Sequence, residues 1–128
     1  DYKVTGVQTC ALPIFCEVTL PVTEKVTQQH GFVHGGVTGM IADSAAGYAA
    51  FSLMPPDSSP LTVEYKINML NPAAGEALVA RARVIKSGRT LVVTEGDVFA
   101  VKDGAETLCA TMQQTLIVMR GVPDTRRA

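Results

Sequence analysis

The stretch Gly35-Gly-Val-Thr-Gly-Met-Ile-Ala-Asp-Ser-Ala-Ala-Gly-Tyr-Ala-Ala-Phe-Ser-Leu-Met54 decides the fold of this chain. It contains no proline and is rich in alanine, and Pro55-Pro56-Asp57 follows it, where a helix cannot continue. The sequence therefore predicts one helix over residues 35–54. Because the segment is apolar nearly all round, we expect a buried helix rather than a surface one.

Two faces of this helix differ in the size of their side chains. The large side chains share one broad face: Val37, Met40, Ile41, Tyr48 and Phe51. A second stripe contains small residues and one carboxylate: Gly39, Asp43, Ala46, Gly47 and Ala50. Small residues let another backbone approach closely. Asp43 stands alone in this stripe, and an ionisable group there is costly unless it is paired or functional.

Strand patterns surround the helix. Residues 15–22 form a β-prone segment before it, and Leu61–Met69 alternates apolar and polar side chains, as in a half-buried strand. Further strands are expected over residues 77–86, 90–101 and 106–119, joined by turns at Ser87-Gly88 and Asp103-Gly104. One face of the two middle strands carries small or medium side chains and could seat a helix closely.

The order of these elements predicts an α+β fold. One strand, one long buried helix and then four strands indicate an antiparallel β-sheet of about five strands wrapped around a single helix. The chain lacks the alternation of helices and strands that builds a doubly wound parallel sheet, so that fold class is excluded.

Composition narrows the possible partners. The chain has 128 residues, enough for one domain, and its net charge of -1 argues against non-specific nucleic-acid binding. No run approaches the roughly 20 apolar residues of a membrane span. The three cysteines (Cys10, Cys16 and Cys109) have an odd count and no metal-ligand spacing, so we expect reduced thiols in a cytoplasmic protein.

The first fourteen residues form a separate problem. The segment Val4-Thr-Gly-Val-Gln-Thr-Cys-Ala-Leu-Pro-Ile14 resembles the translation of a widely used sequencing adapter. Residues 1–14 are therefore interpreted as a non-native leader acquired in metagenomic assembly, residues 15–119 as the domain and residues 120–128 as a C-terminal tail. The alternative is a genuine N-terminal strand.

Most of the residues that could take part in a reaction lie in one segment, Gln28-Gln-His-Gly-Phe-Val-His-Gly-Gly-Val-Thr-Gly-Met-Ile-Ala-Asp43. Gly35 and Gly36 open the helix, so their free N–H groups lie at its positive end, uncovered by side chains. A carbonyl placed there would have its developing oxyanion stabilised by about 3 kcal/mol per donor. Asp43 lies two turns further on, about 12 Å away by helical rise. A partner subunit could bring a second Asp43 to this end of the helix.

The motif His34-Gly35-Gly36, followed after six residues by Asp43, resembles the PaaI-like (phenylacetyl-CoA thioesterase type) branch of the hotdog thioesterases. Three downstream segments share the resemblance: Leu61-Thr-Val-Glu-Tyr-Lys-Ile-Asn68, Pro72-Ala-Ala-Gly-Glu76 and Ser87-Gly88-Arg89-Thr90. It covers about residues 15–119. The resemblance implies a hotdog fold and hydrolysis of an acyl-CoA thioester to free acid and CoA.

Roles for individual residues follow from this resemblance. Asp43 would act as general base on water or as nucleophile, with both possibilities open. The Gly35 N–H would form the oxyanion hole, and Thr62 would help to hold the water or the carboxylate. Gln28 stands where the family commonly has Asn; Gln29 or His30 could take its place.

The resemblance also implies how the substrate is bound. The substrate-binding candidates are His34, Gly36, Lys86, Gly88 and Arg89. Lys86 and Arg89 flank the hairpin and could meet the CoA phosphates; the alternative is a solvated turn. CoA belongs to the substrate, and no other cofactor is expected. The protein would be a homodimer or tetramer with active sites at the subunit interface. The sequence is compatible with an aromatic and with an aliphatic acyl group.

The sequence also allows other roles for Asp43 and His34 and other functions for the chain. Asp43 could be a structural acid bonded by Thr38 or Tyr48, and His34 could simply bond the loop backbone. The chain could be a hotdog dehydratase or hydratase, or a non-catalytic acyl-CoA-binding protein. His30 and His34 lie in a glycine-containing loop without a third ligand nearby, so we expect no metal site.

The interpretation of residues 1–14 predicts a stability result. A chain that begins at Phe15 should fold with a melting temperature within a few degrees of the full chain, because a foreign leader has not been selected to pack against the domain. Thermal unfolding of both chains measures the difference. A large loss of stability would show that the leader packs into the native domain.

Overall fold

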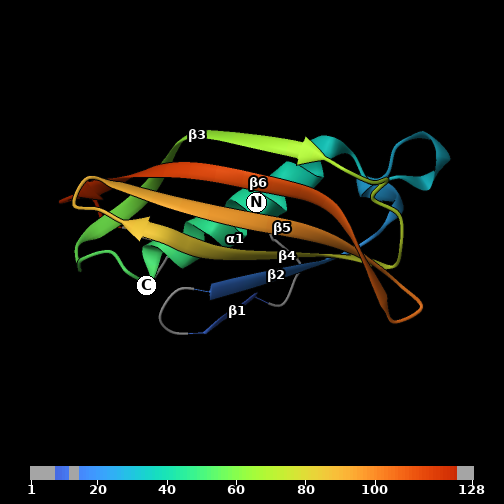
Figure 1. Cartoon of the computed structure of the whole chain (residues 1–128), viewed down its shortest axis with the longest axis horizontal. Coiled ribbons are helices and arrows are strands. Elements are labelled where there is room, and N and C mark those ends of the chain that lie inside the picture. The colour runs from blue at the N-terminus through green and yellow to red at the C-terminus, as the bar shows by residue number, and fades with distance from the viewer. Residues whose placement is uncertain (1–7, 12–14, 124–128) are drawn as a thin grey trace.

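One antiparallel sheet and one long helix dominate the computed structural model, which describes residues 8–11 and 15–123 (Figure 1). The strands are β1 (Gln8–Ala11), β2 (Phe15–Pro21), β3 (Ser58–Met69), β4 (Ala77–Ser87), β5 (Leu91–Lys102) and β6 (Ala105–Arg120). The helices are the short 3-10 turns η1 (Glu24–Val26) and η2 (Gln29–Gly31) and the α-helix α1 (Gly35–Phe51). No helix in the described ranges is long and apolar enough to cross a membrane.

The sheet has the strand order β1-β2-β4-β5-β6-β3, and every neighbouring pair is antiparallel. Figure 1 shows α1 lying along one face of this sheet, behind its long strands. The five strands from Phe15 onward and the single enclosed helix confirm the predicted α+β class and the hotdog fold. The sixth strand, β1, pairs with β2 at the edge of the sheet.

Strand β1 lies within the fourteen residues interpreted as a foreign leader. Its pairing with β2 agrees with the alternative of an N-terminal strand. Residues 1–7 and 12–14 lie outside the described residues, as do residues 124–128 of the proposed tail. The division into leader, domain and tail stays a prediction.

Alanines let α1 lie close to the sheet. The buried residues of the helix are Thr38, Gly39, Ile41, Ala42, Ala45, Ala46, Ala49 and Ala50. They pack on the small and medium side chains of the middle strands, including Leu78, Ala80, Ala82 and Val98, which confirms that this sheet face seats a helix. Ala46 and Ala50 are thus covered by the chain's own sheet. At these two positions of the small-residue stripe, the backbone that approaches closely is therefore that of the chain's own sheet.

Helix α1 ends at Phe51, three residues before the predicted end at Met54. Ser52 is its C-cap, and the N–H groups of Leu53 and Met54 donate to Ala50 O and Phe51 O, both at 3.1 Å. These i→i−3 bonds form a tight turn, which the sequence pattern does not separate from the helix because its residues remain apolar.

A β-bulge divides β3 into two halves with opposite phase. Thr62 pairs with Leu116 and Glu64 with the adjacent Thr115, so Val63 is the extra residue. Residues at odd spacing normally point to opposite faces of a strand, yet Thr62 and Tyr65 both turn toward α1. The predicted unbroken alternation over Leu61–Met69 is therefore wrong at the bulge.

Strand β3 forms an edge of the sheet and leaves apolar side chains exposed. Leu61 is 53%, Val63 50%, Tyr65 46% and Met69 53% exposed. A long edge strand with exposed apolar side chains is a surface that another chain can pair with.

The cysteines differ from the expectation of reduced thiols. Cys16 is disulfide-bonded, and the register of β1 with β2 puts Cys10 directly opposite it. The expectation is therefore wrong at Cys16, because an odd number of cysteines does not exclude one disulfide between neighbouring strands. Cys109 on β6 is a free, buried thiol, and burial raises its pKa.

The close contact between α1 and the sheet predicts the effect of a larger side chain. Ala46→Leu should destabilise the fold by about 1–3 kcal/mol, because Ala46 is fully buried and the added atoms would have to push the helix away from the strands. Chemical denaturation measures this difference. Ala105→Leu makes the same change at an exposed position and should be nearly neutral. Equal stability of both variants would show that the helix is not closely packed.

Candidate active site

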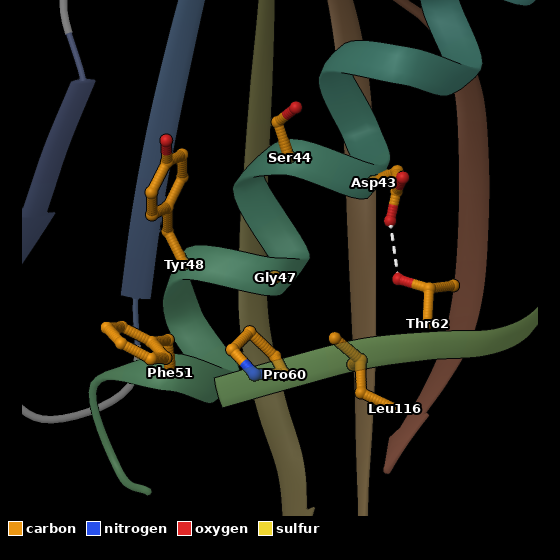
Figure 2. Close-up of a pocket in the computed structure, with 8 residues that line it drawn as sticks. All are labelled: Asp43, Ser44, Gly47, Tyr48, Phe51, Pro60, Thr62 and Leu116. Atoms are coloured by element: carbon orange, nitrogen blue, oxygen red, sulfur yellow. Dashed lines mark hydrogen bonds between the residues drawn. The ribbon is translucent and has the colours of Figure 1, made fainter. Parts of the chain in front are cut away.

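A hollow of about 230 Å³ opens between the C-terminal half of α1 and the start of β3 (Figure 2). We call it the Asp43 hollow; its lining residues are Asp43, Ser44, Gly47, Tyr48, Phe51, Pro60, Thr62 and Leu116. Gly47 leaves open space at its position on the helix, since a Cβ there would meet nothing within 4 Å. The hollow thus combines one carboxylate with aromatic and aliphatic walls.

Two side chains hold the Asp43 carboxylate. The Thr62 hydroxyl donates to Asp43 Oδ1 at 2.8 Å, as Figure 2 shows, and Gln114 Nε2 donates to the same oxygen at 2.9 Å. Gln114 Nε2 also lies 3.1 Å from Thr62 Oγ1. Oδ2 accepts no hydrogen bond from the described part of the chain. One carboxylate oxygen is therefore fixed, while the other remains available to a ligand.

The local folding of three elements produces this arrangement. Asp43 lies on the half-buried flank of α1, and the β3 bulge turns Thr62 toward it. Gln114 points inward from β6, in the same row as the buried Met112 and Leu116. Sequence reasoning missed Gln114, although an amide in an otherwise apolar inward-facing row was a usable signal.

The partners proposed for a structural Asp43 are wrong. The Thr38 hydroxyl instead donates to His34 O at 3.4 Å, and Tyr48 is 44% exposed on the other side of the hollow. The bonds to Asp43 come from the sheet and not from its own helix.

The N-terminus of α1 presents free backbone donors. The preceding loop is held by bonds from His34 N to Val26 O at 3.0 Å and from Val33 N to Ala73 O at 2.9 Å. The N–H groups of Gly35 and Gly36 donate to no acceptor within the described residues. Both glycines are exposed, and nothing lies within 4 Å of a Cβ placed at Gly36. This end of the helix can therefore accept an oxygen atom of a ligand.

A second hollow, the Gly35 hollow, adjoins this helix end. Its lining residues are Gln28, Phe32, Val33, Gly35, Thr38, Met69, Asn71, Pro72, Ala73 and Cys109. The structure thus brings Gln28 together with Gly35, and Thr62 together with Asp43. Asp43 does not line the Gly35 hollow, so within one chain the two halves of the expected site are separate.

The other candidate residues line neither hollow. The side chains of His34, Lys86 and Arg89 are exposed. The turn requires glycine at position 88 for a structural reason. The Gly88 N–H donates to Leu91 O at 2.8 Å, and a Cβ at this position would lie 2.7 Å from that oxygen. Arg89 contributes a backbone oxygen that accepts from the Arg120 guanidinium at 2.8 Å.

His30, weighed as a substitute for Gln28, adopts a φ of 69° in η2 and its ring lies 6.5 Å from that of Phe32. Within the described residues, no three His, Cys, Asp or Glu side chains are grouped so that they could hold a metal ion. The groups that could act on a substrate are thus the Asp43 carboxylate, with its hydrogen-bond donors Thr62 and Gln114, and the free N–H groups at the N-terminus of α1.

Residues 30–107 match the family model for the thioesterase superfamily. The chain belongs to the thioesterase superfamily. The match includes the helix with Gly35 and Asp43 and the strands β3, β4 and β5, so both hollows are built largely from the matched segment.

Individual thioesterase-superfamily relatives agree with this assignment. A putative esterase of Saccharolobus solfataricus is 36% identical over 97 residues, which cover 76% of this chain and 62% of the relative, so the chain spans less than two thirds of that protein. The 1,4-dihydroxy-2-naphthoyl-CoA hydrolase of Listeria monocytogenes is 32% identical over 80% of this chain and 81% of its own length. The crystal structure of a thioesterase family protein from Silicibacter pomeroyi superposes with a TM-score of 0.89 at 46% identity, covering 92% of this chain and 87% of that one.

Proposed function

We propose that this protein hydrolyses an acyl-CoA thioester to a free carboxylic acid and CoA, with Asp43 as its catalytic carboxylate. The observation that carries the proposal is the carboxylate itself: Oδ1 accepts from Thr62 and Gln114, while Oδ2 is left open beside a hollow. Membership of the thioesterase superfamily and the CoA thioester hydrolase among the relatives support the same reaction class.

The reaction needs a nucleophile at the thioester carbon. With Asp43 as general base, a water molecule transfers a proton to Oδ2 while its oxygen bonds to the carbonyl carbon. The tetrahedral intermediate then collapses, the C–S bond breaks, and the CoA sulfur leaves with the proton that Asp43 took from water. With Asp43 as nucleophile, Oδ2 itself bonds to the carbonyl carbon and displaces the thiolate, and water hydrolyses the resulting mixed anhydride.

The oxyanion of the intermediate would be stabilised by the N–H of Gly35, supported by Gly36 at the same helix N-terminus. Along one helix Gly35 is about 12 Å from Asp43, which is too far for both to act on one carbonyl. The donor would therefore come from a second copy of the chain. The exposed apolar side chains of β3 and the open flank of α1 are suited to such a two-fold contact.

Substrate recognition would be divided in the same way. The acyl group would occupy the apolar parts of the two hollows, near Phe51 and Met69. Gln28 would bond the substrate beside Gly35, and His34 would border the same entrance. The hairpin of Lys86, Gly88 and Arg89 would meet the CoA phosphates with its exposed cations. The proposed reaction uses no cofactor beyond the CoA carried by the substrate.

The first test of this function is thiol release from a panel of aromatic and aliphatic acyl-CoAs. We expect turnover by the unmodified protein, and a fall in kcat/KM of about 10²–10⁴ for Asp43→Asn, which is nearly isosteric but loses the base or nucleophile. Binding of acyl-CoA should persist in the variant. No release from any thioester would favour a non-catalytic binding protein, and near-normal turnover of Asp43→Asn would refute the role of Asp43.

The second test addresses the shared site. An inactive Asp43→Ala chain mixed with an inactive Gly35→Val chain should recover about a quarter of the normal activity, because half the dimers are mixed and each has one intact site of two. A Cβ at Gly35 would lie 3.3 Å from Met69 Cε, the flexible end of a side chain, which has to shift by a few tenths of an ångström to admit the Val side chain. Each variant incubated with itself is the control. If verified mixed dimers remain inactive, the site lies within one subunit.

A further inference from the structure

The proposed reaction assigns no role to the buried amide of Gln114. Gln114 is 0% exposed, in the middle of β6, opposite Thr94 on β5 and Tyr65 on β3. Its neighbours on the inward face, Met112 and Leu116, are apolar. An apolar side chain of similar size would fill this place without burying an amide, and buried amides are costly unless they are hydrogen-bonded.

The nitrogen of this amide is fully used. An NH₂ group has two hydrogens, and Gln114 Nε2 lies 2.9 Å from Asp43 Oδ1 and 3.1 Å from Thr62 Oγ1. The single hydroxyl hydrogen of Thr62 is directed at Asp43 Oδ1, at 2.8 Å. The three groups form a closed triangle in which every available hydrogen is donated and Oδ1 receives two of them.

The oxygen of the same amide is not used. Gln114 Oε1 is buried and has no hydrogen-bond partner among the described residues. A side chain chosen for stability alone would not leave an acceptor unpaired in the core. The orientation of the amide is therefore set by what its nitrogen does for Asp43 and Thr62.

The backbone of Gln114 is also fixed. The buried Thr94 hydroxyl donates to Gln114 O at 3.2 Å, and the residue is paired on both sides within the sheet. Gln114 lies behind Asp43 and does not line the Asp43 hollow, so a ligand there meets Asp43 and Thr62 but not the amide.

We infer that Gln114 is a positioning residue for the proposed hydrolysis, which holds Oδ1 of Asp43 together with Thr62 and so selects Oδ2 as the oxygen that meets water or the thioester carbon. This inference rests on the proposed function of Asp43. Without the amide, the carboxylate is held by Thr62 alone and can rotate, so Oδ2 spends less time at the reacting position.

Gln114→Met tests the inference, because it keeps the length of the side chain and removes both donors. We expect kcat to fall roughly 10- to 100-fold while KM stays within about threefold, since the substrate does not touch the amide. The melting temperature should not fall with it. Gln113→Met is the matched control: the same change in the adjacent residue, whose side chain is exposed, should leave kcat unchanged.

The same substitution in the Asp43→Asn background distinguishes positioning from a general structural role. If Gln114 acts through Asp43, adding Gln114→Met to Asp43→Asn should change the residual rate by less than about twofold. An equal loss in both backgrounds, or an effect confined to KM, would overturn the inference. If Gln114→Met does not fold, Gln114→Asn keeps an amide that is one methylene too short and is judged by the same criteria.

The two proposals fail in different ways. Near-normal turnover of Asp43→Asn would refute the proposed function itself. A strongly reduced kcat/KM for Asp43→Asn combined with a normal kcat for Gln114→Met would overturn only the role of Gln114.

Discussion

The close approach of α1 to the sheet is the constraint on which the rest of the structure depends. Alanines on the helix meet small and medium side chains on the strands, so the two layers lie close to each other. Asp43 has a short side chain, and it reaches donors on β3 and β6 only because the helix axis is held close to those strands. Packing and chemistry are thus linked: a change that pushes the helix outward also moves the carboxylate from its donors.

The bulge in β3 is the second feature that makes the site. A regular strand would turn either Thr62 or Tyr65 away from the helix, since their spacing is odd. The extra residue lets both face inward, with Thr62 on Asp43 and Tyr65 beside Gly39. Bulges often redirect a side chain at a functional site, and the one between Thr62 and Glu64 does so here.

The site also lowers the stability of the fold, because it buries a polar atom that has no hydrogen-bond partner among the described residues. The unpaired Oε1 of Gln114 lies in the core, where an unsatisfied acceptor costs about 1–3 kcal/mol. The edge strand β3 adds a second liability, because its apolar side chains face solvent in an isolated chain. Both features make sense together if one orients a reactive carboxylate and the other forms a contact with a second copy that completes the site.

The sequence by itself determined the class of fold, the five strands from Phe15 onward and the position of the helix, because hydrophobic periodicity, proline and glycine act over a few residues. It also singled out Asp43 and the Gly35-Gly36 helix start, since a lone carboxylate and paired glycines stand out in an apolar segment. The bulge, the end of the helix at Phe51, the disulfide at Cys16 and the role of Gln114 required the tertiary structure. Each of these depends on which residues lie opposite one another across strands and layers, and contacts between Asp43 and Gln114, 71 positions apart, leave no local pattern in the chain.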